Sequence, residues 1–226
     1  MLSVARQPRV PVVFELGKRQ ESALVEEWLS RKAVRFRRVW DREGGQLMAR
    51  TERLCGFSYP SQVKQVTVLL HRRRRGDARG DMVETQPDTV NLYLRKSDTW
   101  ASIKDALIHE LVHSMMWARY YYGPRRREAS FFEDFFSDEL LTSLLEQMIL
   151  KKEVNAKEAL DYALSYVTER LKHLRKQKDY GILLESWREY AETYLKRIRR
   201  GESNALLERR RILESLKSPL PARLDA

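Results

Sequence analysis

Two histidines and a glutamate are the residues of this sequence whose types and spacing point most directly to chemistry. They form the string His109-Glu110-Leu111-Val112-His113, an H-E-x-x-H pattern. On a helix, residues four apart lie on one face about one turn from each other, so both imidazoles can bind a single zinc ion. Glu110 points slightly around the helix, where its carboxylate can reach a water beside the ion as a general base. The alternative is a buried helix whose two histidines are hydrogen-bonded core residues.

A catalytic zinc ion usually has three protein ligands and an open position for water, so one further ligand is expected. His173 lies sixty positions after His113, and we expect its side chain in solvent on the polar face of its helix. The acidic run Glu133–Glu139 is the better source. It would lie on the next helix, packed antiparallel across the turn at Gly123-Pro124.

With these residues the sequence resembles the gluzincin metallopeptidases. Residues Asp134–Leu145 are similar to the E-x-x-A-D-x-F-A-x-x-L-L pattern of ImmA/IrrE-type peptidases, with Asp134 standing where that pattern has Glu. The resemblance implies that Asp134 completes the zinc site and that Asp138 orients a ligand histidine from behind. Glu133 is the alternative third ligand, because its distance of twenty residues from His113 is typical of that clan.

The resemblance covers about residues 90 to 150 and implies hydrolysis of a peptide bond. Zinc would acidify its water and polarise the scissile carbonyl, and Glu110 would take the proton and deliver it to the leaving amine. An extended peptide substrate would add as a further strand beside Thr89–Leu94. The donor that stabilises the oxyanion stays open among Tyr120, Tyr121, Tyr122, Tyr162 and Tyr166.

The hydrophobic pattern predicts the elements that come before the H-E-x-x-H string. Apolar residues at helical spacing predict a helix over Glu21–Val39, closed by Gly44-Gly45. A run rich in β-branched residues predicts a strand over Val63–Leu70. Arg72–Gly80 reads as a solvated hairpin connection, and the alternation over Val90–Leu94 predicts a second strand with one face buried.

Helices are expected from there to the end of the chain. The first covers Ser102–Tyr122, with Ser102 and Asp105 as a capping box, and the next runs from Ser130 to about Leu150. The predicted fold class is therefore α+β: a zincin-like core with a small sheet and an active-site helix, extended by a C-terminal all-helical region. Residues 1–150 would form the metallopeptidase core and residues 151–226 the extension.

Composition excludes several classes of protein. The chain has 226 residues, of which 42% are hydrophobic, and its single cysteine cannot form an internal disulfide. Cys55 is expected to be a small buried apolar residue. Met1–Gly17 does not resemble a signal peptide, and no run approaches the roughly 20 apolar residues of a membrane span. The sequence therefore predicts a cytoplasmic protein with no membrane partner.

The positive charge of the chain suggests a second hypothesis. There are 43 Lys and Arg against 32 Asp and Glu, a formal net charge of +11. Between Arg170 and Arg211 the basic residues number 13 and the acidic residues six, and Arg72–Arg75 adds a basic loop. Such surfaces can contact nucleic acid. The alternative to a peptidase is thus a basic helical module that binds nucleic acid or protein, with a structural or degenerate zinc site.

Overall fold

The computed structural model describes residues 10–17, 21–75, 79–83, 86–122 and 141–150, with short stretches and single positions after them (158, 161, 192–194, 196–197, 200–204 and 207–208). The chain divides into two compact units. The first comprises Met1–Arg50 and Ser58–Arg125, and the second comprises Thr51–Phe57 and Arg126–Ala226. None of the helices in the described residues is both long and apolar enough to cross a bilayer.

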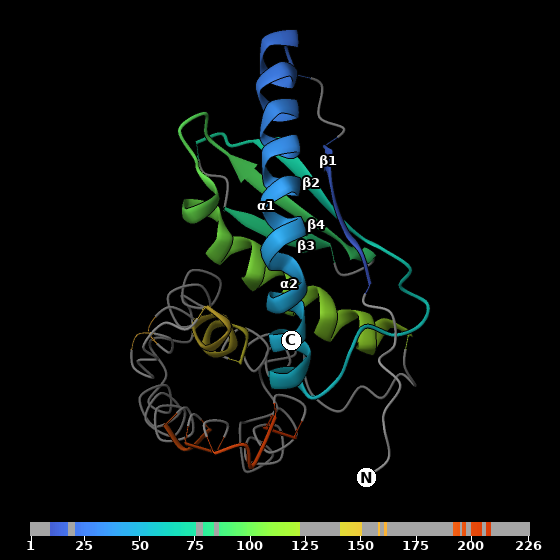
Figure 1. The fold of residues 1–226 in the computed structure, drawn as a ribbon, viewed down its shortest axis with the longest axis vertical. Helices are drawn as coiled ribbons and strands as arrows, with labels where there is room; N and C mark the ends of the chain where they lie inside the picture. Colours follow the sequence, from blue (N-terminus) through green and yellow to red (C-terminus); the bar gives the residue numbers. More distant parts are fainter. Residues whose placement is uncertain are drawn as a thin grey trace, which may run out of the picture. The chain divides into compact units, whose positions relative to one another are not determined.

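The first unit holds a four-stranded sheet, one complete helix and most of another, whose last residues belong to the second unit (Figure 1). Its strands are β1 (Val12–Leu16), β2 (Val66–Arg72), β3 (Gly80–Val83) and β4 (Gln86–Leu94). Their order is β1-β2-β4-β3, with β1, β2 and β4 parallel and β3 antiparallel to β4. The protein is thus mixed α/β with a small sheet, as predicted.

This topology corrects two expectations about the strands. β2 and β4 are parallel neighbours, so the segment after β2 is no hairpin connection between them; the hairpin is formed by β3 and β4. β4 is paired on both sides, so the edge on which a peptide could add is not Thr89–Leu94. The edge next to β4 is β3, which the sequence did not reveal.

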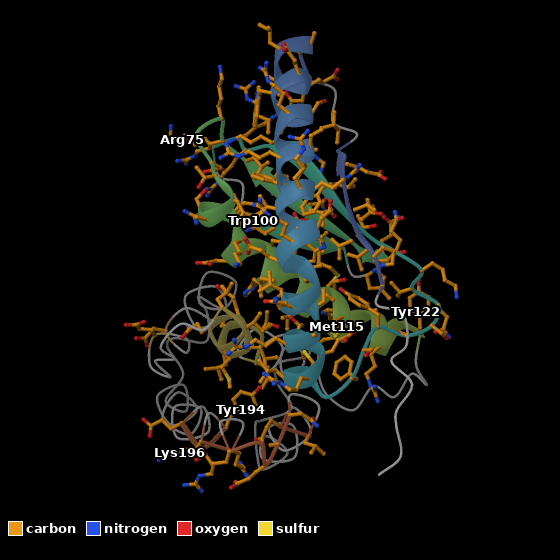
Figure 2. The ribbon with its side chains drawn as sticks, viewed as in Figure 1. Arg75, Trp100, Met115, Tyr122, Tyr194 and Lys196 are labelled. Carbon is orange, nitrogen blue, oxygen red and sulfur yellow. The ribbon has the colours of Figure 1, made fainter. Side chains whose placement is uncertain are left out.

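Both helices pack on the same face of the sheet. Side chains on that face alternate along β2 and β4 and are fully buried: Val66, Val68, Leu70, Val90, Leu92 and Leu94. Phe14 of β1 shares the face and meets Trp40 of α1 (Ala23–Cys55) at 6.1 Å between ring centroids. Trp100 is the first residue of α2 (Trp100–Tyr122; Figure 2). Its ring centroid lies 6.5 Å from that of Phe14. Aromatic contacts of this kind fix α1 and the start of α2 over the sheet.

Helix α1 continues through the two glycines that were expected to end it. A Cβ atom at Gly44 would lie 2.3 Å from Cε2 of Trp40, so the missing side chain gives the indole its space. The helix ends instead at Cys55, after which Gly56 takes a φ of 81° and donates its N–H to Glu52 O at 2.9 Å. A glycine in the left-handed region is a common helix terminus.

Helix α2 begins two residues earlier than predicted, with a different cap. The Thr99 N–H donates to Ser102 Oγ at 2.9 Å, and the Ser102 N–H donates to Thr99 Oγ1 at 3.3 Å. The reciprocal pair is therefore Thr99 with Ser102, and the predicted pair of Ser102 with Asp105 is wrong. Thr99 is the N-cap because the helix starts at Trp100.

In the second unit, residues 141–149 are helical, which agrees with the end of the helix predicted from Ser130 to Leu150. Leu141, Leu144 and Leu145 are fully buried. Cys55 is buried, as predicted. Tyr194 is also fully buried, and its burial raises the pKa of its hydroxyl group well above the ordinary value. The predicted boundary near residue 151 falls in a segment outside the described residues and stays a prediction.

Candidate metal centre

Helix α2 holds the H-E-x-x-H residues inside the first unit. Leu107, Ile108, Leu111 and Val112 are fully buried around them, so this part of the helix has no solvent-facing side. His109, Glu110 and His113 keep only 7%, 8% and 6% of their exposure. Buried polar side chains are stable when they are paired with each other or with a ligand. Two imidazoles and a carboxylate are thus buried within one stretch of α2 rather than exposed on its surface.

The two imidazoles converge through the same ring nitrogen. Nε2 of His109 and Nε2 of His113 are 3.1 Å apart, with ring centroids separated by 4.7 Å and planes at 76°. Two nitrogens bound to one tetrahedral zinc ion, each about 2.05 Å away, would be separated by about 3.3 Å. The pair therefore fits two positions of a zinc site. The same distance suits a hydrogen bond in which one neutral imidazole donates to the other.

Glu110 lies against the edge strand β3. An ideal Cβ atom placed on Gly80 would be 2.7 Å from Glu110 Cγ and 3.1 Å from its Oε1. The carboxylate therefore occupies the space that a side chain at Gly80 would need. Strand β3 and helix α2 meet at this point, and the sequence alone did not connect the two residues.

A chain of buried hydrogen bonds anchors α2 one residue after His113. Ser114 Oγ donates to Pro87 O, which belongs to β4. The Tyr59 hydroxyl lies 2.8 Å from Ser114 Oγ and 3.2 Å from Leu111 O, and both oxygens are acceptors within reach of its single hydrogen. Tyr59 is 5% exposed and Ser114 is fully buried, so these bonds tie the helix to β4 in the protein interior.

A second polar network lies on the opposite face of the sheet. From the sequence we expected only that this face of the strand is not buried. Asn91 accepts a bond from His71 Nε2 at 2.9 Å and donates to Asp81 Oδ1 at 2.6 Å. Tyr93 donates to Asp81 Oδ2 at 2.9 Å and stacks on His71. The network links β2, β4 and β3 through side chains. Only the alternation of Asn91 and Tyr93 along β4 could have indicated it.

The remaining predicted site residues are not described. Glu133, Asp134 and Asp138 lie outside the described residues, and so do Tyr162, Tyr166 and His173. Among described residues, no group of three or more His, Cys, Asp or Glu side chains is placed to hold a metal ion. The structure thus brings His109 and His113 together and buries Glu110 on the same helix, and the third ligand stays a prediction. Comparisons with protein-family models, with curated proteins and with solved structures found no match for this chain.

Proposed function

We propose that the protein is a zinc-dependent peptidase of the gluzincin type, similar to ImmA/IrrE peptidases, with a zincin-like core. The observation that carries this proposal is the 3.1 Å convergence of His109 Nε2 and His113 Nε2 beside the buried Glu110. These two imidazoles would hold the ion, together with a carboxylate from Asp134 or Glu133. A cytoplasmic protein or peptide would be the substrate, and residues 151–226 would form a helical extension.

The role of the chain's own residues follows from their placement. When bound, zinc would supply a Lewis acid that acidifies a water molecule and polarises the scissile carbonyl. Glu110 would accept the proton of the attacking water and return it to the leaving amine. Its burial excludes bulk water from that proton transfer, which strengthens electrostatic interactions at the site.

The sheet edge supports a way to hold the substrate. β3 ends the order of described strands and is antiparallel to β4, so its outer backbone groups face away from the sheet. An extended peptide could pair with this edge and pass Gly80, which touches Glu110. β3 thus takes the role that the sequence assigned to Thr89–Leu94.

Metal analysis and a cleavage assay test the proposal together. Wild-type protein purified without chelator should hold close to one zinc ion per chain and cleave casein or a peptide library. His113→Ala should lose both zinc and activity, whereas Glu110→Gln should keep zinc and lose activity, because the amide cannot act as a base. His173→Ala is the matched histidine control and should change neither. Wild-type protein that takes up no zinc after reconstitution would refute the proposal.

Two further variants identify the third ligand. If Asp134 is the ligand, Asp134→Ala should lose zinc and Glu133→Ala should retain it. The opposite result would assign Glu133 instead. Loss of zinc in neither variant would show that the third ligand lies elsewhere.

A second candidate function is nucleic-acid contact, favoured by one feature of α1. Four exposed arginines at helical spacing form a basic stripe along this helix: Arg31, Arg35, Arg38 and Arg42. Arg31 pairs with Glu27 at 3.0 Å in a solvent-exposed ion pair, and Arg42 interacts electrostatically with Glu43. Arginine binds phosphate oxygens in a bidentate manner, so the stripe suits a phosphate backbone.

Salt dependence tests this second function. Four phosphate contacts predict that log K for duplex DNA falls with log salt concentration at a slope of about −3.6. Changing the four stripe residues to glutamine should flatten that slope to near zero, whereas the exposed Arg53, changed likewise, should leave it unaltered. A slope that the stripe variant does not change would rule out this surface.

A further inference from the structure

Gly80 is glycine for a reason of space rather than of backbone conformation. Its backbone is not in the left-handed region, since among the described glycines only Gly56 and Gly201 have positive φ. A Cβ atom there would meet Glu110 Cγ at 2.7 Å, Oε1 at 3.1 Å and Cδ at 3.2 Å. Real Cβ atoms essentially never approach a heavy atom closer than 3.0 Å. Any side chain at Gly80 must therefore displace either β3 or Glu110.

Strand β3 is held too firmly to yield. Gly80 pairs with Leu92 in the antiparallel ladder, and the Tyr93 N–H donates to Arg79 O at 2.9 Å. The next residue, Asp81, accepts two side-chain bonds from β4, one from Asn91 at 2.6 Å and one from Tyr93 at 2.9 Å. Because backbone and side-chain bonds flank Gly80, the strand cannot swing away from α2 without breaking several of them.

The backbone of Glu110 is equally fixed, because it belongs to α2 between residues that are fully buried. The flexible part of the contact is therefore the carboxylate arm of Glu110. A methyl group at Gly80 would push this arm out of its present place against β3.

We propose that Gly80 is a positioning residue for Glu110: the bare backbone of the edge strand leaves the space in which the general base is held. This inference rests on the proposed peptidase function. Gly80 would not touch the reacting atoms; it would act only through the carboxylate. A displacement of about 1 Å in a catalytic group costs on the order of 10²-fold in rate. Gly80→Ala should therefore lower kcat about 10²-fold while KM and zinc content stay nearly unchanged.

A double-mutant cycle tests whether the effect passes through Glu110. In the wild-type background, Gly80→Ala should lower Tm by roughly 2–12 °C, as expected for an overpacked site. In the Glu110→Ala background the clashing atoms are absent, so the same change should leave Tm unaltered or raise it, and should leave the residual kcat unaltered. In the Glu110→Gln background, which keeps the shape of the side chain, Gly80→Ala should again lower Tm.

Gly45→Ala is the matched control, because Gly45 is an exposed glycine inside α1. It should keep kcat and should not lower Tm, since alanine favours a helix over glycine. Equal Tm losses from Gly80→Ala with and without the Glu110 side chain would overturn the inference, as would an unchanged kcat. Wild-type protein that binds no zinc and cleaves nothing would overturn the peptidase itself, whereas the Tm cycle would still decide whether Gly80 makes room for Glu110.

Discussion

Replacing Ser114 by alanine should remove the hydrogen-bond chain that anchors α2 beside the candidate metal centre. The Ser114 hydroxyl has one hydrogen, which it donates to Pro87 O. Tyr59 is therefore the donor in its 2.8 Å contact with Ser114 Oγ. Without Ser114 Oγ, the Tyr59 hydroxyl can donate its hydrogen to Leu111 O at 3.2 Å instead, but the buried Pro87 carbonyl loses the Ser114 donor.

The expected loss of free energy of unfolding follows from these hydrogen bonds. An unsatisfied buried polar group destabilises a protein by about 1–3 kcal/mol, so Ser114→Ala should cost about 2 kcal/mol. For a chain of this length that corresponds to a decrease in Tm of about 4–8 °C. Tyr59→Phe removes one bond and leaves no donor unsatisfied, so it should cost only about 1 kcal/mol. Thermal unfolding followed by circular dichroism would measure both.

The order of the two effects is the critical result. If Tyr59→Phe destabilises the protein more than Ser114→Ala, the Pro87 carbonyl is not the group that needs its donor, and the reasoning is wrong. In the Ser114→Ala background, Tyr59→Phe should cost less than in the wild type because its stronger partner is already gone. Ser61→Ala is the control. Ser61 is exposed and bonds only weakly, to Gln62 at 3.4 Å, so its loss should shift Tm by no more than about 2 °C.

Three other perturbations have defined outcomes. Thr99→Ala should lose the cap formed with Ser102 and cost about 1 kcal/mol in urea unfolding, whereas Thr99→Ser should retain most of it. Phe36→Ala should cost about 3–5 kcal/mol in the same assay, because this fully buried ring packs on Trp100. The bond from Lys104 lowers the pKa of Glu43 below 4.5, so the pair stabilises the fold above that pH and loses its effect as acid protonates the carboxyl group. Glu43→Gln should therefore cost about 0.5 kcal/mol at pH 7 and less below pH 4.5, as measured by unfolding across pH.

The elements with strong periodicity were predicted from the sequence with only small errors at their ends. The helix expected over Ser102–Tyr122 is Trp100–Tyr122, and the two strands expected around Val68 and Val90 are present. The strands that the sequence did not predict, β1 and β3, depend on contacts with other strands rather than on their own hydrophobic pattern. β1 has only five residues and pairs with a strand 54 positions away, and β3 is a four-residue strand held by side chains of β4.

Two wrong predictions concern glycines and have one physical cause. A glycine has no side chain whose size or polarity would indicate which residues surround it in the fold. Gly44-Gly45 was interpreted as a helix end, yet Gly44 lies inside α1 because the Trp40 indole fills its side-chain position. Gly80 was interpreted as part of a solvated connection, yet it contacts Glu110 across 30 positions of sequence. The H-E-x-x-H string could be recognised because its spacing is local to one helix. Gly80, which leaves room for the Glu110 side chain, could not be recognised because it lies 30 positions earlier in the sequence.

The parallel pairing of β1 with β2 has a consequence for synthesis of the chain. Val12 pairs with Val66, whereas Thr67 of β2 pairs with Thr89 only 22 positions on. Closing the longer loop costs about 0.8 kcal/mol more in chain entropy, so β1 should join after β2 and β4 have met. At typical translation speeds, the 54 residues from Val13 to Val66 take about 3–11 s to be made. For that interval the apolar β1 segment leaves the ribosome without its partner strand, and a chaperone that binds extended apolar segments would have time to reach it.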